Sequence, residues 1–373
     1  MVKIVHTADW QLGKPFGGFP EDVRSALTEA RFEVIDRIAA VALAHQALHV
    51  VVAGDVFDNI DPGDRVLGQA LSRMDQAPVT WWLMPGNHDH ARAAGLWTRV
   101  RARAPDKVRI LDTPVATMLE EGAWLLPAPL DHRRNRDDPT AGFGEMATPP
   151  GATRIGLAHG SITEFGGSND SSNLISPDRA RTAGLDYLAL GDWHGHLEIN
   201  AHTAYSGTPE VDRFGRDEAG SVIVADVRLG APPRLERVET GRFRWLTRHW
   251  ELSDAKDFEH QLDAFRASCK PARTLLKLTV AGAVSLAARV AVLERLEQDV
   301  AHALRWLEAR SEDLLASPTD DDLSNIDVQG VLALVAERLL ASSRSGEVSA
   351  HTARAALERL YIEALRVGDE ASS

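Results

Sequence analysis

Side chains that bind metals follow five strand-like segments in the first 196 residues of this chain. The clearest is Asp55, which follows a run of β-branched residues and Gly54, at the end of what reads as a buried strand. The other four strand ends carry Asp9, the run Asn87-His88-Asp89, His159, and the pair Asp192 and His194. A buried carboxylate must be paired or bound to a metal. One Gly-Asp alone is equally consistent with a plain turn.

The carboxyl ends of strands lie together at one edge of a sheet, so these five segments can converge although they are far apart in sequence. A set of Asp, Asn and His residues does not suit a serine-type triad. It suits two divalent metals that share one carboxylate, and such a pair can clamp the attacking and leaving oxygens of a phosphoester. The sequence therefore predicts a dinuclear metal site.

Length and composition predict a multidomain globular protein of the cytoplasm. The chain has 373 residues, of which 44% are hydrophobic and 25% charged, so roughly two or three domains with a sizeable core are expected. A single cysteine, Cys269, excludes an internal disulfide and suits a reducing compartment. There is no run of about 18 apolar residues and no signal sequence, so we expect no membrane association.

The charge balance restricts how the chain could bind DNA. Its 41 basic and 54 acidic side chains give a net charge of −13, whereas a protein that holds DNA by bulk charge is basic. Binding would need a local patch, which we expect near Arg99, Arg101 and Arg103, and near Arg133 and Arg134. Such a patch would contact phosphates. A solvated helix face is the alternative.

Residues 1–240 alternate between strand and helix, which predicts an α/β domain. The expected strands are residues 2–5, 49–53, 79–84, 108–111, 123–126, 154–158, 187–190 and 221–227. Apolar spacing predicts helices at 23–45, 64–76 and 94–104. Residues 131–153 contain three prolines and are expected to form a loop.

Two further parts are expected after residue 240. Residues 241–312 have a βαβαβ pattern, which predicts a small α/β domain. Residues 311–325 are acidic and predict a linker. Residues 326–373 carry two apolar helical stripes, one from Val328 to Leu340 and one from Ala353 to Leu365, which predict a helical hairpin.

The order of the motifs resembles the calcineurin-like metallophosphoesterase superfamily, and within it the SbcD-like nuclease subunits of bacterial DNA double-strand-break repair complexes. The resemblance covers nearly all of residues 1–220. It is carried by HTADWQLG (6–13), VVAGDVFD (51–58), MPGNHD (84–89), AHG (158–160), YLALGDWHGH (187–196) and YSGTPEVDRFG (205–215). It implies a metallophosphoesterase β-sandwich flanked by helices, then a small α/β capping domain and a C-terminal helical hairpin.

The resemblance also implies a role for each motif residue. Asp55 would bridge both metals, and His88 would stabilise charge or transfer a proton at the substrate phosphate, with Asp89 orienting it. The first metal would be bound by Asp9, Gln11 and His194, and the second by Asn87, His159 and Asp192. Of these groups, His88 is the histidine that the resemblance does not make a metal ligand, and imidazole is a side chain suited to proton transfer near neutral pH.

Two ligand positions differ from the family pattern. Gln11 stands where the family has histidine, and Asp192 stands where it has the first histidine of Gly-His-x-His. The set loses two imidazoles and gains a carboxylate, which favours Mn²⁺ or Mg²⁺ over Zn²⁺. We expect Mn²⁺ and a weakly bound first metal. His196 is a candidate to replace a lost imidazole. Trp10 and Trp193 are expected to pack in the core around the site.

Three functions remain open on the sequence alone. The favoured one is a metal-dependent DNA phosphodiesterase that acts with a coiled-coil ATPase of the SbcC type, docked on the hairpin, and that forms a homodimer. A phosphodiesterase for nucleotides or small phosphoesters is the second. A scaffold or regulatory subunit of an ATPase complex, with activity lowered by Gln11 and Asp192, is the third.

Overall fold

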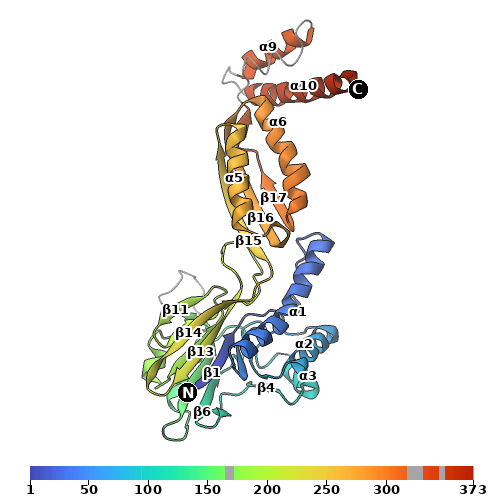
Figure 1. Ribbon diagram of the computed structural model, residues 1–373. Helices are drawn as coiled ribbons and strands as arrows, with labels where there is room; N and C mark the ends of the chain where they lie inside the picture. The colour runs from blue at the N-terminus through green and yellow to red at the C-terminus, as the bar shows by residue number, and fades with distance from the viewer. Residues whose placement is uncertain (94, 164–171, 317–330, 344–348, 373) are drawn as a thin grey trace. The chain divides into compact units, whose positions relative to one another are not determined.

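The computed structural model describes residues 1–373 apart from 94, 164–171, 317–330, 344–348 and 373 (Figure 1). The chain divides into two compact units, Met1–Arg244 and Trp245–Ser373. Among the described residues, no helix is both long and apolar enough to cross a membrane. The division expected from the sequence, into 1–240, 241–312 and 326–373, stays a prediction.

The first unit contains two six-stranded sheets. In the first sheet, four neighbouring strands run parallel and two antiparallel strands extend one side. In spatial order the strands are β14 (Ala231–Glu239), β13 (Ser221–Arg228), β1 (Val2–Thr7), β2 (His49–Ala53), β3 (Thr80–Met84) and β4 (Val108–Ile110). The carboxyl ends of β1, β2 and β3 therefore lie side by side.

The second sheet has a parallel centre and antiparallel edges. Its strands are, in order, β11 (Leu197–Asn200), β12 (Thr203–Tyr205), β10 (Tyr187–Gly191), β7 (Thr153–His159), β6 (Ala123–Ala128) and β5 (Thr117–Glu120). A core cluster joins the two sheets through fully buried residues such as Ile4, Val51, Leu125 and Leu157. This shared core holds the ends of β7 and β10 against those of β1 and β2.

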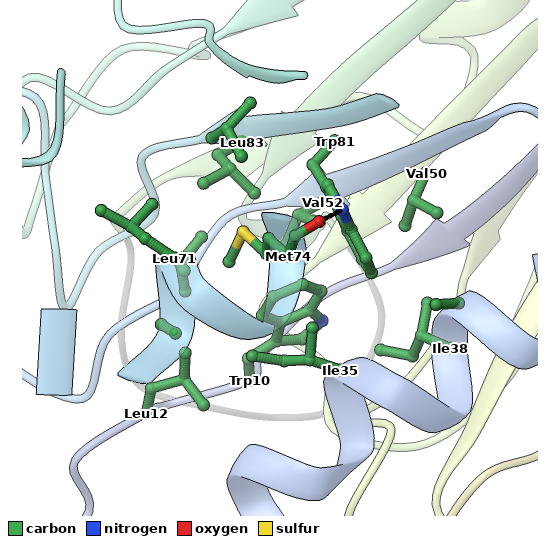
Figure 2. Close-up of a cluster of buried hydrophobic side chains, with 14 of the residues drawn as sticks. Trp10, Leu12, Ile35, Ile38, Val50, Val52, Leu71, Met74, Trp81 and Leu83 are labelled. Carbon is green, nitrogen blue, oxygen red and sulfur yellow. Dashed lines mark hydrogen bonds between the residues drawn. The ribbon is translucent and has the colours of Figure 1, made fainter. Parts of the chain in front are cut away.

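Three helices cover the outer face of the first sheet: α1 (Glu21–Ala44), α2 (Asp64–Gln76) and α3 (Leu96–Arg103). Figure 2 shows the apolar cluster between them and the sheet, in which Ile35 and Met74 pack with Val52 and Trp81. The indole Nε1 of Trp81 donates to the Met74 carbonyl oxygen at 3.0 Å, so the buried indole keeps a hydrogen bond (Figure 2). Trp10 is fully buried here, as expected.

Smaller elements complete the first unit. The outer face of the second sheet packs against η1 (Ala141–Gly144), β8 (Ser161–Ile162), β9 (Leu174–Ile175) and α4 (Arg179–Thr182). All eight strands expected before residue 240 are present, as are the three helices. The strands β5, β8, β9, β11, β12 and β14 were not expected. Of these, β14 is an edge strand that contains Pro232 and Pro233, and proline does not suit a central strand.

The second unit has the expected βαβαβ order. Its elements are β15 (Arg244–Leu252), α5 (Ala255–Ser268), η2 (Pro271–Arg273), β16 (Thr274–Val284), α6 (Leu286–Arg295), η3 (Leu296–Val300), α7 (Ala301–Ala303), β17 (Trp306–Arg310) and β18 (Leu314–Ala316). β18 pairs with β16, so the first part of the expected linker is wrong: residues 314–316 belong to the sheet. Residues 317–325 lie outside the described part.

Two helices end the chain, α9 (Val331–Ser343) and α10 (Ser349–Ser372), as the stripes predicted. They pack on each other and on α6 through a cluster that includes Val290, Leu340, Leu357 and Tyr361. The α9 stripe is not all buried, because Val331 is 78% exposed, Leu332 44% and Val335 38%. Val328 lies outside the described residues. The hairpin therefore leaves an apolar surface on α9.

Candidate metal centre

The strand ends bring the expected ligands together at one edge of the first unit. Single ligand atoms of Asp9, Asp55 and His159 lie within 4.8 Å of one another, and all three side chains are buried. His159 Nε2 is 3.5 Å from Asp55 Oδ1 and 3.7 Å from Asp192 Oδ1. His194 Nε2 is 4.0 Å from Asp9 Oδ1. Residues that are more than 180 positions apart thus share one site.

Backbone strain is concentrated at the ligands. Asp9, Gln11, Asp55 and Asp192 all have positive φ, at 55°, 45°, 56° and 99°. Only three other described non-glycine residues, Phe16, Gln46 and Asn173, do so. Such strained positions persist where the surrounding structure fixes them, and they cluster at functional sites. Here, the Gln11 backbone N–H donates to the Asp55 carbonyl oxygen at 2.9 Å, so the loop after β1 and the loop after β2 hold each other in place.

Two motif glycines are required by close packing. A Cβ atom on Gly54 would lie 2.3 Å from His159 Nδ1, and one on Gly86 would lie 2.2 Å from Asp55 Oδ1. Gly54 also has φ of +90°, which favours glycine. The glycine before each polar residue therefore allows the ligands to approach one another.

The donor atoms fit a divalent cation. His159 Nδ1 is bonded to the Ala53 carbonyl oxygen at 2.8 Å, which leaves Nε2 for a metal. Asn87 Nδ2 donates to Asp192 Oδ1 at 3.2 Å, which leaves the amide oxygen. Both remaining atoms, His159 Nε2 and Asn87 Oδ1, are buried without a hydrogen-bond partner among the described residues. Buried polar atoms are normally bonded, so this pair matches metal ligands.

Electrostatics also favour a cation at this cluster. Burial raises the pKa of Asp9 to about 6, and the neighbouring carboxylates of Asp55 and Asp192 add to this, although two histidines oppose it. Burial lowers the pKa of His159, but Asp55, Asp9 and Asp192 outweigh it and raise the value to about 9. The carboxylates thus stabilise positive charge, and a divalent ion supplies it more effectively than a proton.

A second set of contacts orients His194. Its Nδ1 lies 3.2 Å from Asp212 Oδ1, and Lys14 Nζ donates to Asp212 Oδ2 at 2.5 Å. Burial alone would raise the pKa of Asp212, but the hydrogen bond with His194 and the charge of Arg31 outweigh it and hold the pKa well below its usual range. A proton on Nδ1 leaves His194 Nε2 to bind metal. Asp212 lies in a family motif, yet its role could not be read from the sequence.

Replacing Asp212 by Asn should weaken Mn²⁺ binding roughly 10- to 100-fold, as loss of a partner that orients a metal ligand typically does. The substitution keeps the shape but removes the charge that fixes the His194 tautomer. Isothermal titration calorimetry of the two proteins measures the effect. Asp226→Asn is the control, since Asp226 on β13 pairs with Lys3 on β1. Equal Mn²⁺ affinity in Asp212→Asn and wild type would remove Asp212 from this role.

Gln11 faces the cluster with its amide nitrogen. Nε2 lies 3.4 Å from His194 Nε2 and 3.5 Å from Asp55 Oδ2, and Lys14 Nζ donates to Gln11 Oε1 at 3.4 Å. A half-turn of the amide would direct its oxygen to the cluster. His6 does not face the cluster: it bonds Tyr187 Oη and the Leu190 carbonyl oxygen, and burial lowers its pKa to about 3.

Asp89 does not hold His88 in the way the resemblance implied. His88 Nδ1 bonds the Asp58 carbonyl oxygen at 2.8 Å, whereas the Asp89 carboxylate accepts from Gly86 N at 2.7 Å and Phe57 N at 3.0 Å. The expectation that Asp89 orients His88 is therefore wrong. Asp89 is fully buried and links its own loop after β3 to Phe57 in the loop after β2. Burial, and then the charge of Asp55, raises the pKa of Asp89 to about 7.

An open polar cavity of about 210 Å³ lies over the cluster. Its walls are Gln11, Lys14, Asp55, Asn87, His88, Asp192, His194 and Arg213. Lys14 and Arg213 place two cations at its rim, and cations of this kind bind phosphate oxygens. Neither of these residues was singled out from the sequence.

The arginines expected to bind DNA lie away from this cavity. Arg99 pairs with Asp61 at 2.6 Å, Arg101 with Asp112 at 2.5 Å and Arg103 with Asp64 at 3.0 Å. These acidic partners offset the positive charge of α3. Arg133 and Arg134 are exposed in the loop after β6. None of the five is among the residues that line the cavity, and their contact with DNA stays a prediction.

Two further expectations need correction. Trp193 does not pack in the core: its side chain is 40% exposed and the Arg216 guanidinium lies 3.6 Å from its ring centroid. His196 Nε2 is 3.7 Å from Glu198 Oε1, so this histidine faces a neighbouring carboxylate rather than replacing a lost imidazole.

The two sheets, the strand-end ligands and the flanking helices define a phosphoesterase. Residues 2–224 match the family model of the calcineurin-like phosphoesterases, and the chain belongs to this family. Among curated proteins it is similar to the SbcD subunit of the SbcCD nuclease from Bacillus subtilis (strain 168), with 33% identity over 290 residues, covering 64% of this chain and 69% of the relative. The fold class and the family predicted from the sequence are confirmed.

Two more distant similarities were found. The SbcD subunit of the SbcCD nuclease from Escherichia coli (strain K12) is 25% identical over 284 residues, covering 64% of this chain and 67% of the relative. The crystal structure of TT1561 of Thermus thermophilus has 13% identity and a TM-score of 0.40, covering 64% of this chain and 99% of that one.

Proposed function

We propose that this protein is a divalent-metal-dependent DNA phosphodiesterase. One observation carries the proposal: buried His159 Nε2 and Asn87 Oδ1 lack hydrogen-bond partners among the described residues and lie beside buried carboxylates, under a cavity rimmed by Lys14 and Arg213. An anionic phosphodiester fits that cavity. DNA as the substrate is supported by the relatives, whose names describe them as subunits of the SbcCD nuclease.

Each ligand has a proposed place. Asp9, Gln11 and His194 would hold one metal, Asn87, His159 and Asp192 would hold the other, and Asp55 would be shared by the two sets. Two divalent cations in such a set activate water and neutralise charge on the phosphoryl oxygens. Lys14 and Arg213 bind the non-reacting phosphate oxygens and hold the diester in place.

His88 is the proposed proton carrier. The Asp58 carbonyl oxygen can only accept, so His88 Nδ1 must carry a proton, and Nε2 is the nitrogen left to exchange a proton with the leaving oxygen. His88 N donates to Asp55 Oδ1 at 2.9 Å, which ties the position of the imidazole to the metal ligands. The residue also lines the cavity.

Mn²⁺ is the proposed metal, with Mg²⁺ as the alternative. Five of the seven proposed ligands offer oxygen and two offer imidazole nitrogen, and oxygen-rich sites favour hard ions over Zn²⁺. The first site is the weaker one, because a neutral amide at Gln11 replaces an imidazole.

Replacing Gln11 by His should tighten one of the two Mn²⁺ sites at least tenfold, about 1.4 kcal/mol, and leave the other unchanged. The imidazole would add a ligand that needs no amide rotation and would act on the site shared by Asp9 and His194. Calorimetric titration resolves the two binding steps. Gln76→His at the exposed end of α2 is the control. Tightening of both sites, or of neither, would argue against the assignment of Gln11 to one metal.

Cleavage assays separate DNA from small substrates. Wild type and His88→Ala are compared on linear DNA and on a chromogenic phosphodiester, with Mn²⁺ and with a chelator. We expect Mn²⁺-dependent DNA cleavage that His88→Ala slows by roughly 10²- to 10⁴-fold. Hydrolysis of the small ester alone would favour the second candidate, a phosphodiesterase for nucleotides or small phosphoesters. Inactivity on both would favour a scaffold role.

A coiled-coil ATPase of the SbcC type is the proposed partner of the second unit. Its support is the apolar surface of α9, where Val331, Leu332, Leu334 and Val335 are all at least 38% exposed. Apolar helix faces of this kind bind other helices. A homodimer, and DNA contacts by Arg133 and Arg134, belong to the same proposal.

A further inference from the structure

A second cavity adjoins the one over the metal ligands. It has a volume of about 240 Å³ and lies between the loop after β10 and residues 208–221. His194 and Arg213 line both cavities. Asp212 lines the second cavity and reaches Lys14, which lines the first. A group covalently attached to a phosphate in the first cavity can therefore extend into the second.

The walls of the second cavity combine apolar surface with unused hydrogen-bonding atoms. Val211, Phe214 and Ala219 supply the apolar part. Arg216 Nη1 and His196 Nδ1 are buried and have no hydrogen-bond partner within the described chain. A nucleobase has an apolar face and a polar edge, and arginine is the side chain that most often reads base edges. The cavity thus has the chemistry of a base-binding site.

Arg216 is held in place for such a role. Its guanidinium lies over the exposed ring of Trp193 at 3.6 Å from the centroid. A Cβ atom on Gly195 would lie 2.4 Å from Arg216 Nη1, so the glycine makes room for the guanidinium. Stacking on Trp193 orients the planar cation without using its N–H groups. Arg216 Nη1, which has no hydrogen-bond partner among the described residues, is then left for a ligand.

We propose that the second cavity binds one nucleobase, that of the nucleotide whose phosphate lies over the metal ligands. This inference rests on the proposed function, because it takes the substrate to be a nucleic acid. The cavity is smaller than the roughly 300–1,000 Å³ of sites for drug-sized ligands, so it takes a single base rather than a base pair. The nucleotide beside the scissile phosphate must then be unpaired.

The test measures binding to the full-length, Mn²⁺-loaded protein by calorimetry. The ligands are a deoxynucleoside 5′-monophosphate and deoxyribose 5-phosphate, which differ only in the base. We expect wild type to bind the nucleotide about tenfold more tightly or better, in line with stacking on one side chain. Phe214→Ala and Arg216→Ala should lose this preference and bind deoxyribose 5-phosphate as wild type does, which also shows that they are folded.

Arg181→Ala is the matched control, since Arg181 is exposed and pairs with Asp178 on the surface. It should keep the preference for the nucleotide. Equal affinity of wild type for the two ligands would overturn the proposal, as would a preference that both Phe214→Ala and Arg216→Ala retain. Cleavage of DNA is scored separately. If DNA is cleaved but wild type does not prefer the nucleotide to deoxyribose 5-phosphate, only the base-binding site is contradicted. If wild type prefers the nucleotide and the two variants do not, the site is supported even when no DNA is cleaved.

Discussion

Asp55→Ala is expected to abolish tight binding of both metals and to lower phosphodiester hydrolysis about 10³-fold or more, a loss of several kcal/mol of transition-state stabilisation. Asp55 sits on the turn after β2, and its Oδ1 lies 3.5 Å from His159 Nε2 while Oδ2 faces Gln11 at 3.5 Å. It is the carboxylate that lies between the two proposed sets of ligands. Its loss therefore affects both sites.

Mn²⁺ titration and turnover of a phosphodiester measure the effect of Asp55→Ala. Asp75→Ala serves as the control, because Asp75 is exposed and pairs with Lys107 away from the cavity. Thermal unfolding without metal shows whether the variant is folded. If Asp55→Ala kept one Mn²⁺ at wild-type affinity, Asp55 would be a ligand of a single metal.

His88→Ala is expected to reduce kcat by roughly 10²- to 10⁴-fold, the usual contribution of a general acid or base, with Mn²⁺ affinity unchanged. The reason is geometric: His88 Nδ1 is occupied by the Asp58 carbonyl oxygen, and the proposed ligand atoms belong to other residues. The variant should retain both binding steps in calorimetry while its turnover falls.

His132→Ala is a suitable control for His88→Ala, since His132 is exposed and its ring faces that of His90. A parallel fall in Mn²⁺ affinity and kcat in His88→Ala would identify His88 as a metal ligand. Wild-type kcat in the variant would remove it from the reaction altogether.

The ligands could be predicted because their signal is local. The first ligand of each motif follows a short apolar run and a small residue, as in Gly54-Asp55 and Gly86-Asn87, and parallel strand order then places these ends together. The same logic predicted the eight strands before residue 240. It missed β11 and β12, which are short, and β14, whose prolines are tolerated only because it is an edge strand.

The residues that support the ligands could not be predicted, because their roles depend on contacts between distant segments. Lys14 reaches Asp212 across 198 positions, and neither has a local pattern that predicts the other. Asp89 adjoins His88 in sequence, yet its carboxylate turns inward to two backbone N–H groups. The charge of α3 read as a basic patch until its acidic partners, Asp61, Asp64 and Asp112, were located.

Anomalous scattering from crystals grown with Mn²⁺ tests whether two metals share the Asp55 carboxylate. Two peaks about 3.5–4 Å apart are expected, both in contact with that carboxylate. One should contact Asp9 and His194, and the other His159 and Asn87 Oδ1. A single peak, or two peaks of which only one touches Asp55, would contradict the shared-carboxylate site.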